Sequence, residues 1–353
     1  MARPSVRFPA ALDDHARNVE RRVDTLLETE IARWRAIDPA LEAPLRSLQA
    51  LVAAGGKRLR PAFAKAAYLG CGGEDDELIV GIGAALEMLH TFAIVHDDIM
   101  DGSDMRRNQA AIHRQFIDAH RAGAWRGEDR RFGEGVAILV GDLAFVYADT
   151  LIPRTPDALA EVWHELRVEL CVGQSLDIVG TARRSTDLDL ARRIAVYKSA
   201  KYTVERPCHL GAAAAGRYQS LAPDLSRFGL PLGEAFQLRD DVLGVFGDEV
   251  MTGKPVGDDL REGKPTPLLA LTDLRADDDA RRLLQRVGSV DLDDVEIKQL
   301  QELIVGLGAL DEVEATIARL AVEAQTVLER IPMREDAREL LQQLTTYVAW
   351  RDH

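Results

Sequence analysis

The spacing of apolar residues along the chain predicts a protein built almost entirely from α-helices. From Leu12 onward, apolar side chains recur three and four residues apart, which places them on one face of a helix. Runs that alternate apolar and polar residues, the pattern of half-buried strands, are scarce. The helical spacing is clearest at Ala84, Ala85, Met88, Leu89, Phe92 and Val95. We therefore expect an all-α fold.

Helix-terminating residues divide this pattern into segments. The polar stretch 121–134 is the best candidate for a surface excursion between helices. No break is long enough to be a disordered linker, so we expect one domain over residues 1–353, although the length also admits two modest domains. The expected breaks are Gly55-Gly56, Gly70 to Gly73, Gly123 to Gly135, Pro153 to Pro156, Thr186, Pro223 and Gly253 to Pro267.

Composition narrows the choice of partners and compartment. The 353 residues are 46% hydrophobic and carry a net charge of -14, so a nucleic acid or an anionic membrane surface is not an expected partner. Any bound anion must therefore meet a local basic site. Three cysteines without CxxC spacing argue against a disulfide framework and a zinc site, which fits a reducing cytoplasm. We find no signal-like N-terminus and no transmembrane run, and expect a soluble cytoplasmic protein.

The first acidic constellation lies at the end of the clearest helical segment. Asp97, Asp98 and Asp101 occupy positions i, i+1 and i+4, so Asp97 and Asp101 share one helix face. Two carboxylates 5 Å apart repel by roughly 3 kcal/mol, which favours a bound cation. Oxygen-only ligands point to magnesium. A solvated acidic helix end would explain a bare DDxxD equally well, but Arg106-Arg107 follows at once. Carboxylates that can bind a metal ion beside arginines that can bind an anion indicate a bound phosphate.

A second acidic constellation and two further basic segments follow the same logic. Asp240 and Asp241 sit on a predicted helix, with Asp248 seven residues beyond and near the same face. The loops after it carry Lys254 and Lys264, which suit phosphate oxygens, although each alone would also fit a solvated loop. Near the N-terminus, GGKRLRP places Lys57 and Arg60 on one face of a helix start. This is not a P-loop, because the GxxxxGK[ST] spacing is absent.

These segments together resemble the trans-isoprenyl diphosphate synthases, also called polyprenyl synthetases, over about residues 55 to 267. The resemblance implies an all-α bundle of long helices around a central substrate channel, and a homodimer. The matching motifs, in the family's order, are GGKRLRP at 55–61, His90, DDIMD at 97–101, Arg106-Arg107, GDLAF at 141–145, GQSLD at 173–177, YKSAKYT at 197–203, FQLRDD at 236–241 and TGKPVGDDLREGKPTP at 252–267.

The resemblance implies a magnesium-dependent condensation of isopentenyl diphosphate with an allylic diphosphate, using three magnesium ions when substrate is bound. Asp97, Asp101 and Asp240 would be metal ligands, with Asp98 and Asp241 in support. The isopentenyl diphosphate site would comprise Lys57, Arg60, His90 and Arg107. The allylic diphosphate site would comprise Arg106, Lys198, Ser199, Gln237, Lys254 and Lys264. Taken singly, His90 would also fit a hydrogen-bonded core histidine, and Lys198 an exposed helix lysine.

Three positions depart from the family pattern. Gly244 stands where many members have the third aspartate of the second motif. A metal ion at this motif would therefore have to be bound by Asp240, Asp241 and Asp248. Asn108 and Ala110 replace a frequent glycine and proline after the arginine pair, which affects loop shape rather than chemistry.

Product length is expected to depend on Phe92, five residues upstream of Asp97 and about 7.5 Å back along the helix. By resemblance, an aromatic ring there and no insertion in DDIMD suggest geranylgeranyl diphosphate, with farnesyl diphosphate or a longer chain as alternatives. Phe92 could equally be ordinary helix packing. Other classes are a class I terpene cyclase, whose NSE or DTE motif is absent, and a non-catalytic partner subunit, toward which only Gly244 points.

Overall fold

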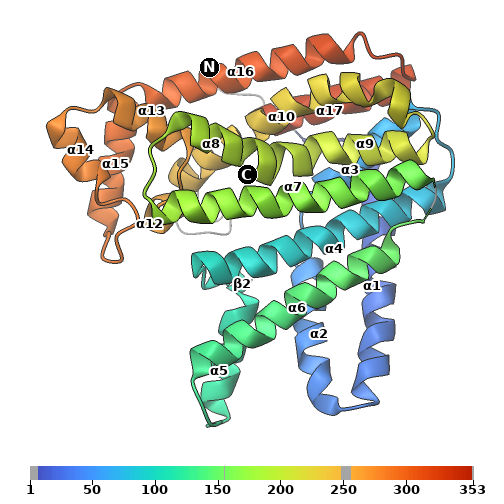
Figure 1. Ribbon diagram of the computed structural model, residues 1–353, viewed down its shortest axis with the longest axis horizontal. Helices are drawn as coiled ribbons and strands as arrows, with labels where there is room; N and C mark the ends of the chain where they lie inside the picture. Colours follow the sequence, from blue (N-terminus) through green and yellow to red (C-terminus); the bar gives the residue numbers. More distant parts are fainter. Residues whose placement is uncertain (1–6, 155, 248–255, 352–353) are drawn as a thin grey trace. The chain divides into compact units, whose positions relative to one another are not determined.

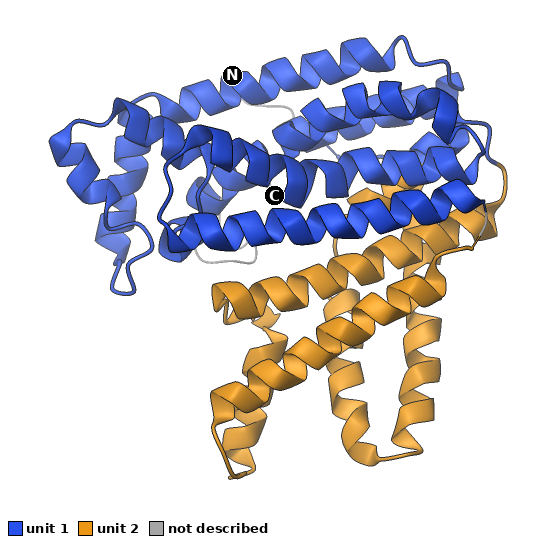
Figure 2. Cartoon of the chain, viewed as in Figure 1, with its two compact units in different colours: residues 1–9, 66–73, 155–353 blue, residues 10–65, 74–154 orange. Residues whose placement is uncertain are grey.

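A computed structural model describes residues 7–154, 156–247 and 256–351 (Figure 1). Within these residues the regular secondary structure is helical apart from one two-stranded hairpin, β1 (Met105–Arg106) and β2 (Gln109–Ala110), so the expected all-α fold is confirmed. The chain divides into two compact units, coloured separately in Figure 2. Unit 1 comprises Met1–Pro9, Ala66–Gly73 and Thr155–His353, and unit 2 comprises Ala10–Lys65 and Glu74–Arg154.

Unit 2 is organised around α4, which packs most extensively against α6 and also against α1. Its long helices are α1 (Asp13–Arg35), α2 (Glu42–Ala53), α4 (Asp76–Asp101), α5 (Ile112–Ala122) and α6 (Asp129–Leu151), with the first turns of α3 (Leu59–Gly70) and the short 3₁₀ helices η1 (Ala10–Leu12) and η2 (Pro39–Leu41). The buried residues of α1 recur at helical spacing, namely Val19, Val23, Leu27 and Ile31. This stripe is the apolar face that α1 turns toward the unit's core.

Helix α4 is apolar enough to cross a membrane by length and composition, yet 72% of its most apolar window is buried inside the protein. It therefore serves as a core helix of the described fold. Its ends are well defined, because the Asp75 side chain accepts a hydrogen bond from the Leu78 amide and Gly102 adopts a φ of 69°. The helix thus stops directly after Asp101.

Unit 1 is organised around α10, which packs against η3, α9, α16 and α17. Its elements are the end of α3, α7 (Asp157–Ala182), α8 (Leu188–Ile194), the π-helix η3 (Ala195–Glu205), α9 (Arg206–Ala214), α10 (Tyr218–Phe246), α12 (Asp258–Glu262), α13 (Pro267–Arg275), α14 (Asp278–Leu284), α15 (Asp294–Gly306), α16 (Ala309–Leu328) and α17 (Glu335–Trp350). A buried apolar cluster joins α10 to α12, α13, α15 and α16.

Two expected loop boundaries are wrong. Pro223 does not break the helical pattern but lies inside α10, and the break falls at Gly216, whose φ of 69° ends α9. An interior proline costs about 3 kcal/mol, which the burial of residues such as Leu225 and Phe228 on α10 offsets. The expected excursion at 121–134 shrinks to 123–128, because Asp129 and the Arg130–Glu134 ion pair stabilise the first turn of α6.

The buried histidine His15 links stability to pH. It lies on α1 against Gly83 of α4, and burial, helped by the charge of Lys65, lowers its pKa from 6.5 to about 4. The folded chain therefore keeps His15 neutral where the unfolded chain protonates it. The stability that His15 contributes is complete above pH 6.5 and is lost as the pH falls toward its folded pKa.

We predict that acidification from about pH 7.5 to about pH 5 lowers the free energy of unfolding less in His15→Gln than in the wild type, by about 1–2 kcal/mol. Urea unfolding followed by circular dichroism at both pH values measures this difference. His164→Gln, on the exposed side of α7, should behave like the wild type. An equal loss in the wild type and His15→Gln would contradict the assignment.

Candidate active site

The candidate site residues predicted from the sequence fall in both units. Asp248 and Lys254 lie outside the described residues. In unit 2, α4 carries Asp97, Asp98 and Asp101 in its last two turns. Asp97 and Asp101 are partly exposed, whereas Asp98 is only 2% exposed and accepts hydrogen bonds from Arg106, at 2.8 Å to Nε and 2.5 Å to a terminal nitrogen. The structure thus separates two partly exposed carboxylates from a buried one that holds an arginine.

The position of these carboxylates on α4 is electrostatically costly. They cluster at the C-terminal end of the helix, where the peptide dipoles place partial negative charge. Each carboxylate there is disfavoured by a few tenths to about 1 kcal/mol beyond the mutual repulsion. A bound cation would relieve both terms.

A dense basic cluster surrounds His90 in the same unit. Burial, followed by the charges of Arg60, Arg107, Arg58 and Arg106, lowers the pKa of His90 well below its ordinary value. Burial and the neighbouring guanidinium of Arg58 also lower the pKa of Arg107. A neutral imidazole within a group of arginines provides a hydrogen-bonding group without adding charge. This cluster is the strongest candidate anion site in unit 2.

The side-chain hydrogen bonds of Arg58 and the backbone turn at Arg107 hold the basic cluster in place. Arg58 is buried and donates to Glu87 (2.8 Å), Glu20 (3.0 Å) and the Val52 carbonyl (2.9 Å), so it anchors the segment that carries Lys57 and Arg60. Arg107 and Asn108 both have positive φ, at 52° and 59°, and form the two-residue turn of the β1–β2 hairpin. Asparagine tolerates this conformation, so the departure from glycine at 108 leaves the turn intact.

Phe92 lies one and a half turns before Asp97 on α4. Its ring packs against Phe145 of α6 with 4.9 Å between centroids, and against His96 at 4.7 Å. His96 in turn contacts the Ile138 carbonyl at 3.1 Å. Phe92 is partly exposed, so the ring is supported on one side and accessible on another.

In unit 1, the second acidic pair sits near the end of α10. Asp241 is buried and accepts a hydrogen bond from Gln237 Nε2 at 2.7 Å, while the Gln237 carbonyl accepts one from Ser199 of η3. Burial, followed by repulsion from Asp259, raises the pKa of Asp241 well above its ordinary value. Its Oδ2 is buried and has no hydrogen-bond partner within the described ranges. Ser199, Gln237 and Asp241 thus form one chain of contacts.

Asp259 of α12 occupies the space that the departure at Gly244 leaves open. A β-carbon at position 244 would collide with the Asp259 carboxylate. That carboxylate also lies 3.7 Å from the Lys264 ammonium, which pairs with Glu262 as well. Asp259 therefore brings a third carboxylate next to Asp241, a role that sequence spacing did not single out although it lies within the quoted motif.

Lys198 and Arg351 make further contacts with the candidate site residues of unit 1. Lys198 of η3 donates to Asp177 of α7 at 2.5 Å, which gives Asp177 an ion-pair role. Arg351 is only 4% exposed, donates to Asp240, and lies over the Phe236 ring at 4.2 Å. Sequence reasoning missed Arg351 because it lies 111 residues from Asp240 and no motif marks it.

The donor chemistry of these groups fits a hard divalent cation such as magnesium. All the ligand candidates are carboxylate oxygens. The buried Oδ2 of Asp241, which has no hydrogen-bond partner in the described part of the chain, could be satisfied by a bound cation. Among the described residues, no group of three or more His, Cys, Asp or Glu side chains is arranged to hold a metal by itself. Magnesium sites that use few protein carboxylates, with water and substrate phosphate as the remaining ligands, have this character.

Comparison with known proteins gives consistent matches. The sequence profile described as polyprenyl synthetase matches residues 42–304. A short chain isoprenyl diphosphate synthase of Methanothermobacter thermautotrophicus is 33% identical over 88% of this chain and 91% of its own length. A geranylfarnesyl diphosphate synthase of Aeropyrum pernix is 32% identical over 85% of this chain and 92% of its own.

Solved structures agree with these sequence matches. A crystal structure of geranylgeranyl pyrophosphate synthase from Corynebacterium glutamicum, complexed with isoprenyl diphosphate and magnesium, superposes with a TM-score of 0.92. It is 36% identical and covers 96% of this chain and 99% of its own. The similarity therefore extends over nearly the whole length of both chains.

Proposed function

The chain belongs to the polyprenyl synthetase family, and we propose that it is a magnesium-dependent prenyltransferase that condenses isopentenyl diphosphate with allylic diphosphates to geranylgeranyl diphosphate. The observation that carries this proposal is the basic cluster around neutral His90, in the unit whose α4 ends in partly exposed carboxylates. We propose one catalytic domain over residues 1–353.

The isopentenyl diphosphate site is assigned to Lys57, Arg60, His90 and Arg107. The arginines supply the bidentate donors that diphosphate oxygens need. His90, held neutral by its surroundings, adds a hydrogen bond. Arg106 is assigned to the allylic diphosphate instead, and its pairing with Asp98 fixes its direction.

The allylic diphosphate site is assigned to Arg106, Lys198, Ser199, Gln237, Lys254 and Lys264, of which Lys254 lies outside the described residues. Lys198 and Lys264 are each paired with a carboxylate in the free protein, so binding would exchange an acidic side chain for a phosphate oxygen. Ser199 and Gln237 are joined to Asp241 through hydrogen bonds and would orient the same diphosphate. Lys254 completes the assignment.

Catalysis would follow from charge neutralisation at the departing diphosphate. Magnesium ions held by Asp97 and Asp101 and by Asp240, with Asp98 and Asp241 in support, would offset about three negative charges on the leaving group. Lysine and arginine side chains would stabilise the same charge as it develops and keep both substrates oriented. Cleavage of the allylic carbon–oxygen bond would release diphosphate and leave an allylic cation. The isopentenyl double bond would attack this cation to form the new carbon–carbon bond, and the released diphosphate would accept the proton lost from the condensed carbocation.

The geranylgeranyl product is inferred from Phe92, the proposed floor of the growing chain. Phe145 supports its ring from α6, which favours a fixed floor over a side chain that moves aside. Farnesyl diphosphate and longer products are the alternatives. Cys71, Cys171 and Cys208 form no disulfide with one another, which supports a reducing compartment such as the cytoplasm.

We also propose a homodimer formed through α6. This helix carries a row of exposed apolar side chains, Ile138, Leu139 and Val146, with exposures of 45%, 63% and 57%. Large exposed apolar side chains grouped on one helix face are typical of subunit contacts.

The purified protein should condense labelled isopentenyl diphosphate with dimethylallyl, geranyl or farnesyl diphosphate only when magnesium is present. Chain-length analysis of the extracted products should give geranylgeranyl diphosphate. Asp97→Ala should lower turnover by about 10³-fold or more at unchanged melting temperature, because one metal ligand is removed. Unchanged turnover would refute the metal assignment, and no condensation with any primer would favour a cyclase or a regulatory subunit.

Phe92→Ala should lengthen the product by one or more prenyl units, because the floor of the chain is removed. Product analysis by chromatography against prenyl standards measures this shift. Phe132→Ala on α6 is the matched control, since Phe132 packs against Trp125 and His120 and should leave product length unchanged. An unchanged distribution in Phe92→Ala would show that Phe92 is packing only.

Leu139→Glu should convert the homodimer to monomer in sedimentation velocity. A buried carboxylate at a subunit contact costs several kcal/mol, enough to dissociate it. Val305→Glu on α15, with a similar exposure of 51%, should leave assembly unchanged. A wild-type monomer, or a Leu139→Glu dimer, would overturn the proposed contact.

A further inference from the structure

The allylic site residues Lys198 and Ser199 lie on an unusual element. They belong to η3, an 11-residue π-helix from Ala195 to Glu205. π-helical segments are rare, occur mostly as single turns, and are frequent at functional sites. A segment of this length must be held by its surroundings, so the contacts around η3 decide where Lys198 and Ser199 point.

Helix α7 meets η3 through two lysine–carboxylate contacts. Lys201 donates to Glu169 at 2.5 Å, and Lys198 donates to Asp177 at 2.5 Å. Glu169 and Asp177 are two turns apart on α7, while Lys201 and Lys198 run in the opposite order along η3. The Glu169–Lys201 pair is therefore a second contact, besides Lys198–Asp177, that aligns η3 with α7.

Glycines allow this close approach. A β-carbon on Gly173, halfway along α7 from Glu169 to Asp177, would collide with the backbone of Lys198. On the side of α10, a β-carbon on Gly229 would lie 2.8 Å from Glu205 Cα, and one on Gly233 would collide with Ala200. The π-helix thus makes close backbone contacts with α7 on one side and with α10 on another.

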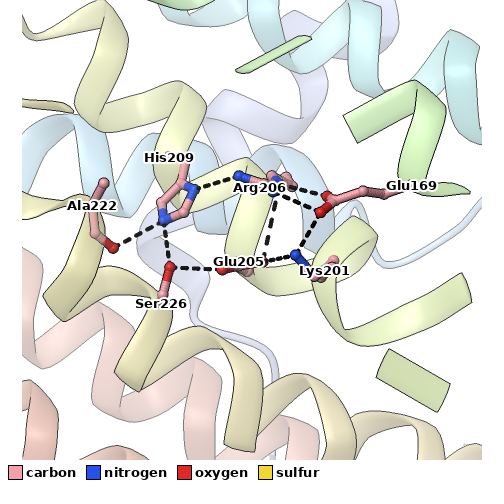
Figure 3. A network of polar contacts seen from close by, with 7 residues as sticks. All are labelled: Glu169, Lys201, Glu205, Arg206, His209, Ala222 and Ser226. Atoms are coloured by element: carbon pink, nitrogen blue, oxygen red, sulfur yellow. Dashed lines mark hydrogen bonds and ion pairs between the residues drawn. The ribbon is translucent and has the colours of Figure 1, made fainter. Parts of the chain in front are cut away.

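Glu169 is the centre of a polar network at the C-terminal end of η3 (Figure 3). Besides Lys201, it accepts two hydrogen bonds from Arg206, both at 2.7 Å. Glu205 lies 3.6 Å from Lys201 and accepts from Ser226 at 2.6 Å. Elements α7, η3, α9 and α10 each contribute side chains to this network, as Figure 3 shows.

The network is charge-balanced and largely removed from water. Two glutamates face one lysine and one arginine, with Glu169 and Glu205 side chains only 8% and 4% exposed. Burial lowers the pKa of His209 to about 4, although the charge of Glu205 partly opposes this shift. This histidine therefore adds no charge at neutral pH. Arg206 reaches the His209 ring at 3.3 Å. The loss of one charged member would therefore leave its partner buried and uncompensated.

We propose that Glu169 is a positioning residue that fixes the π-helical register of η3, and thereby the placement of Lys198 and Ser199 toward the allylic diphosphate. This inference rests on the proposed function. Well-packed apolar side chains would stabilise the same four helices at least as well as buried ion pairs. What the ion pairs add is a unique register, because charged hydrogen bonds tolerate little displacement.

The experiment compares Glu169→Gln with the wild type in steady-state kinetics for both substrates. Glutamine keeps the size of the side chain but removes the charge that binds Lys201 and Arg206. The Michaelis constant for the allylic diphosphate should rise about tenfold and turnover should fall about tenfold, since small misplacements of a substrate-binding group have effects of this size. The Michaelis constant for isopentenyl diphosphate should change less than about twofold, because its assigned residues lie in unit 2.

A double-mutant cycle with Lys198→Ala separates positioning from stability. If Glu169 acts through Lys198, the double variant should be no worse than Lys198→Ala alone. Additive losses, or equal rises in both Michaelis constants, would overturn the proposal. Glu165→Gln, one turn earlier on α7 and exposed, is the matched control and should match the wild type.

A second variant and a measurement of wild-type activity complete the experiment. If Glu169→Gln does not fold by circular dichroism, Lys201→Met removes the same contact from η3 while Arg206 continues to pair with Glu169, and the same cycle applies. Wild-type condensation activity is measured first. Its absence would refute the proposed function, whereas an active wild type with an equally active Glu169→Gln would refute only the positioning role.

Discussion

Repulsion among like charges is the constraint on which the candidate site depends. Unit 2 concentrates arginines around His90 and carboxylates at the end of α4, and unit 1 brings Asp241 and Asp259 together. In the free protein each excess is partly offset by internal partners, as in Asp98–Arg106, Lys198–Asp177 and Arg351–Asp240. In the proposed function, substrate phosphates and metal ions would carry the complementary charges, so binding would replace these internal partners rather than add charge to an empty surface.

The helical scaffold makes this concentration of charge tolerable. Buried apolar faces such as those of α4 and α10 stabilise each unit, while helix ends and helix edges carry the ionic groups. Where helices must approach closely, as at Gly173 and Gly233, the missing side chain lets backbone meet backbone. Packing thereby determines the geometry, and electrostatics determines which ligands that geometry accepts.

Local patterns in the sequence predicted much of this arrangement. The spacing of Asp97 and Asp101 within one helix followed from apolar periodicity, and the basic character near His90 followed from motif order. Non-local effects were missed: Arg351 reaches Asp240 from the far end of the chain, and Asp259 fills the space at Gly244. The π-helix and the continuation of α10 through Pro223 were also missed, because tertiary packing outweighs local propensity there. The pairing of Glu169 with Lys201 likewise needed coordinates, since 32 residues separate them.

The contact at Gly244 constrains how this chain could change by mutation. Because the Asp259 carboxylate occupies the place of a side chain at 244, an aspartate introduced there would require the Asp259 side chain to rotate away. That rotation would also change the 3.7 Å contact between Asp259 and Lys264. A substitution on α10 would therefore alter the surroundings of a lysine that follows α12, although no motif in the sequence couples the two positions.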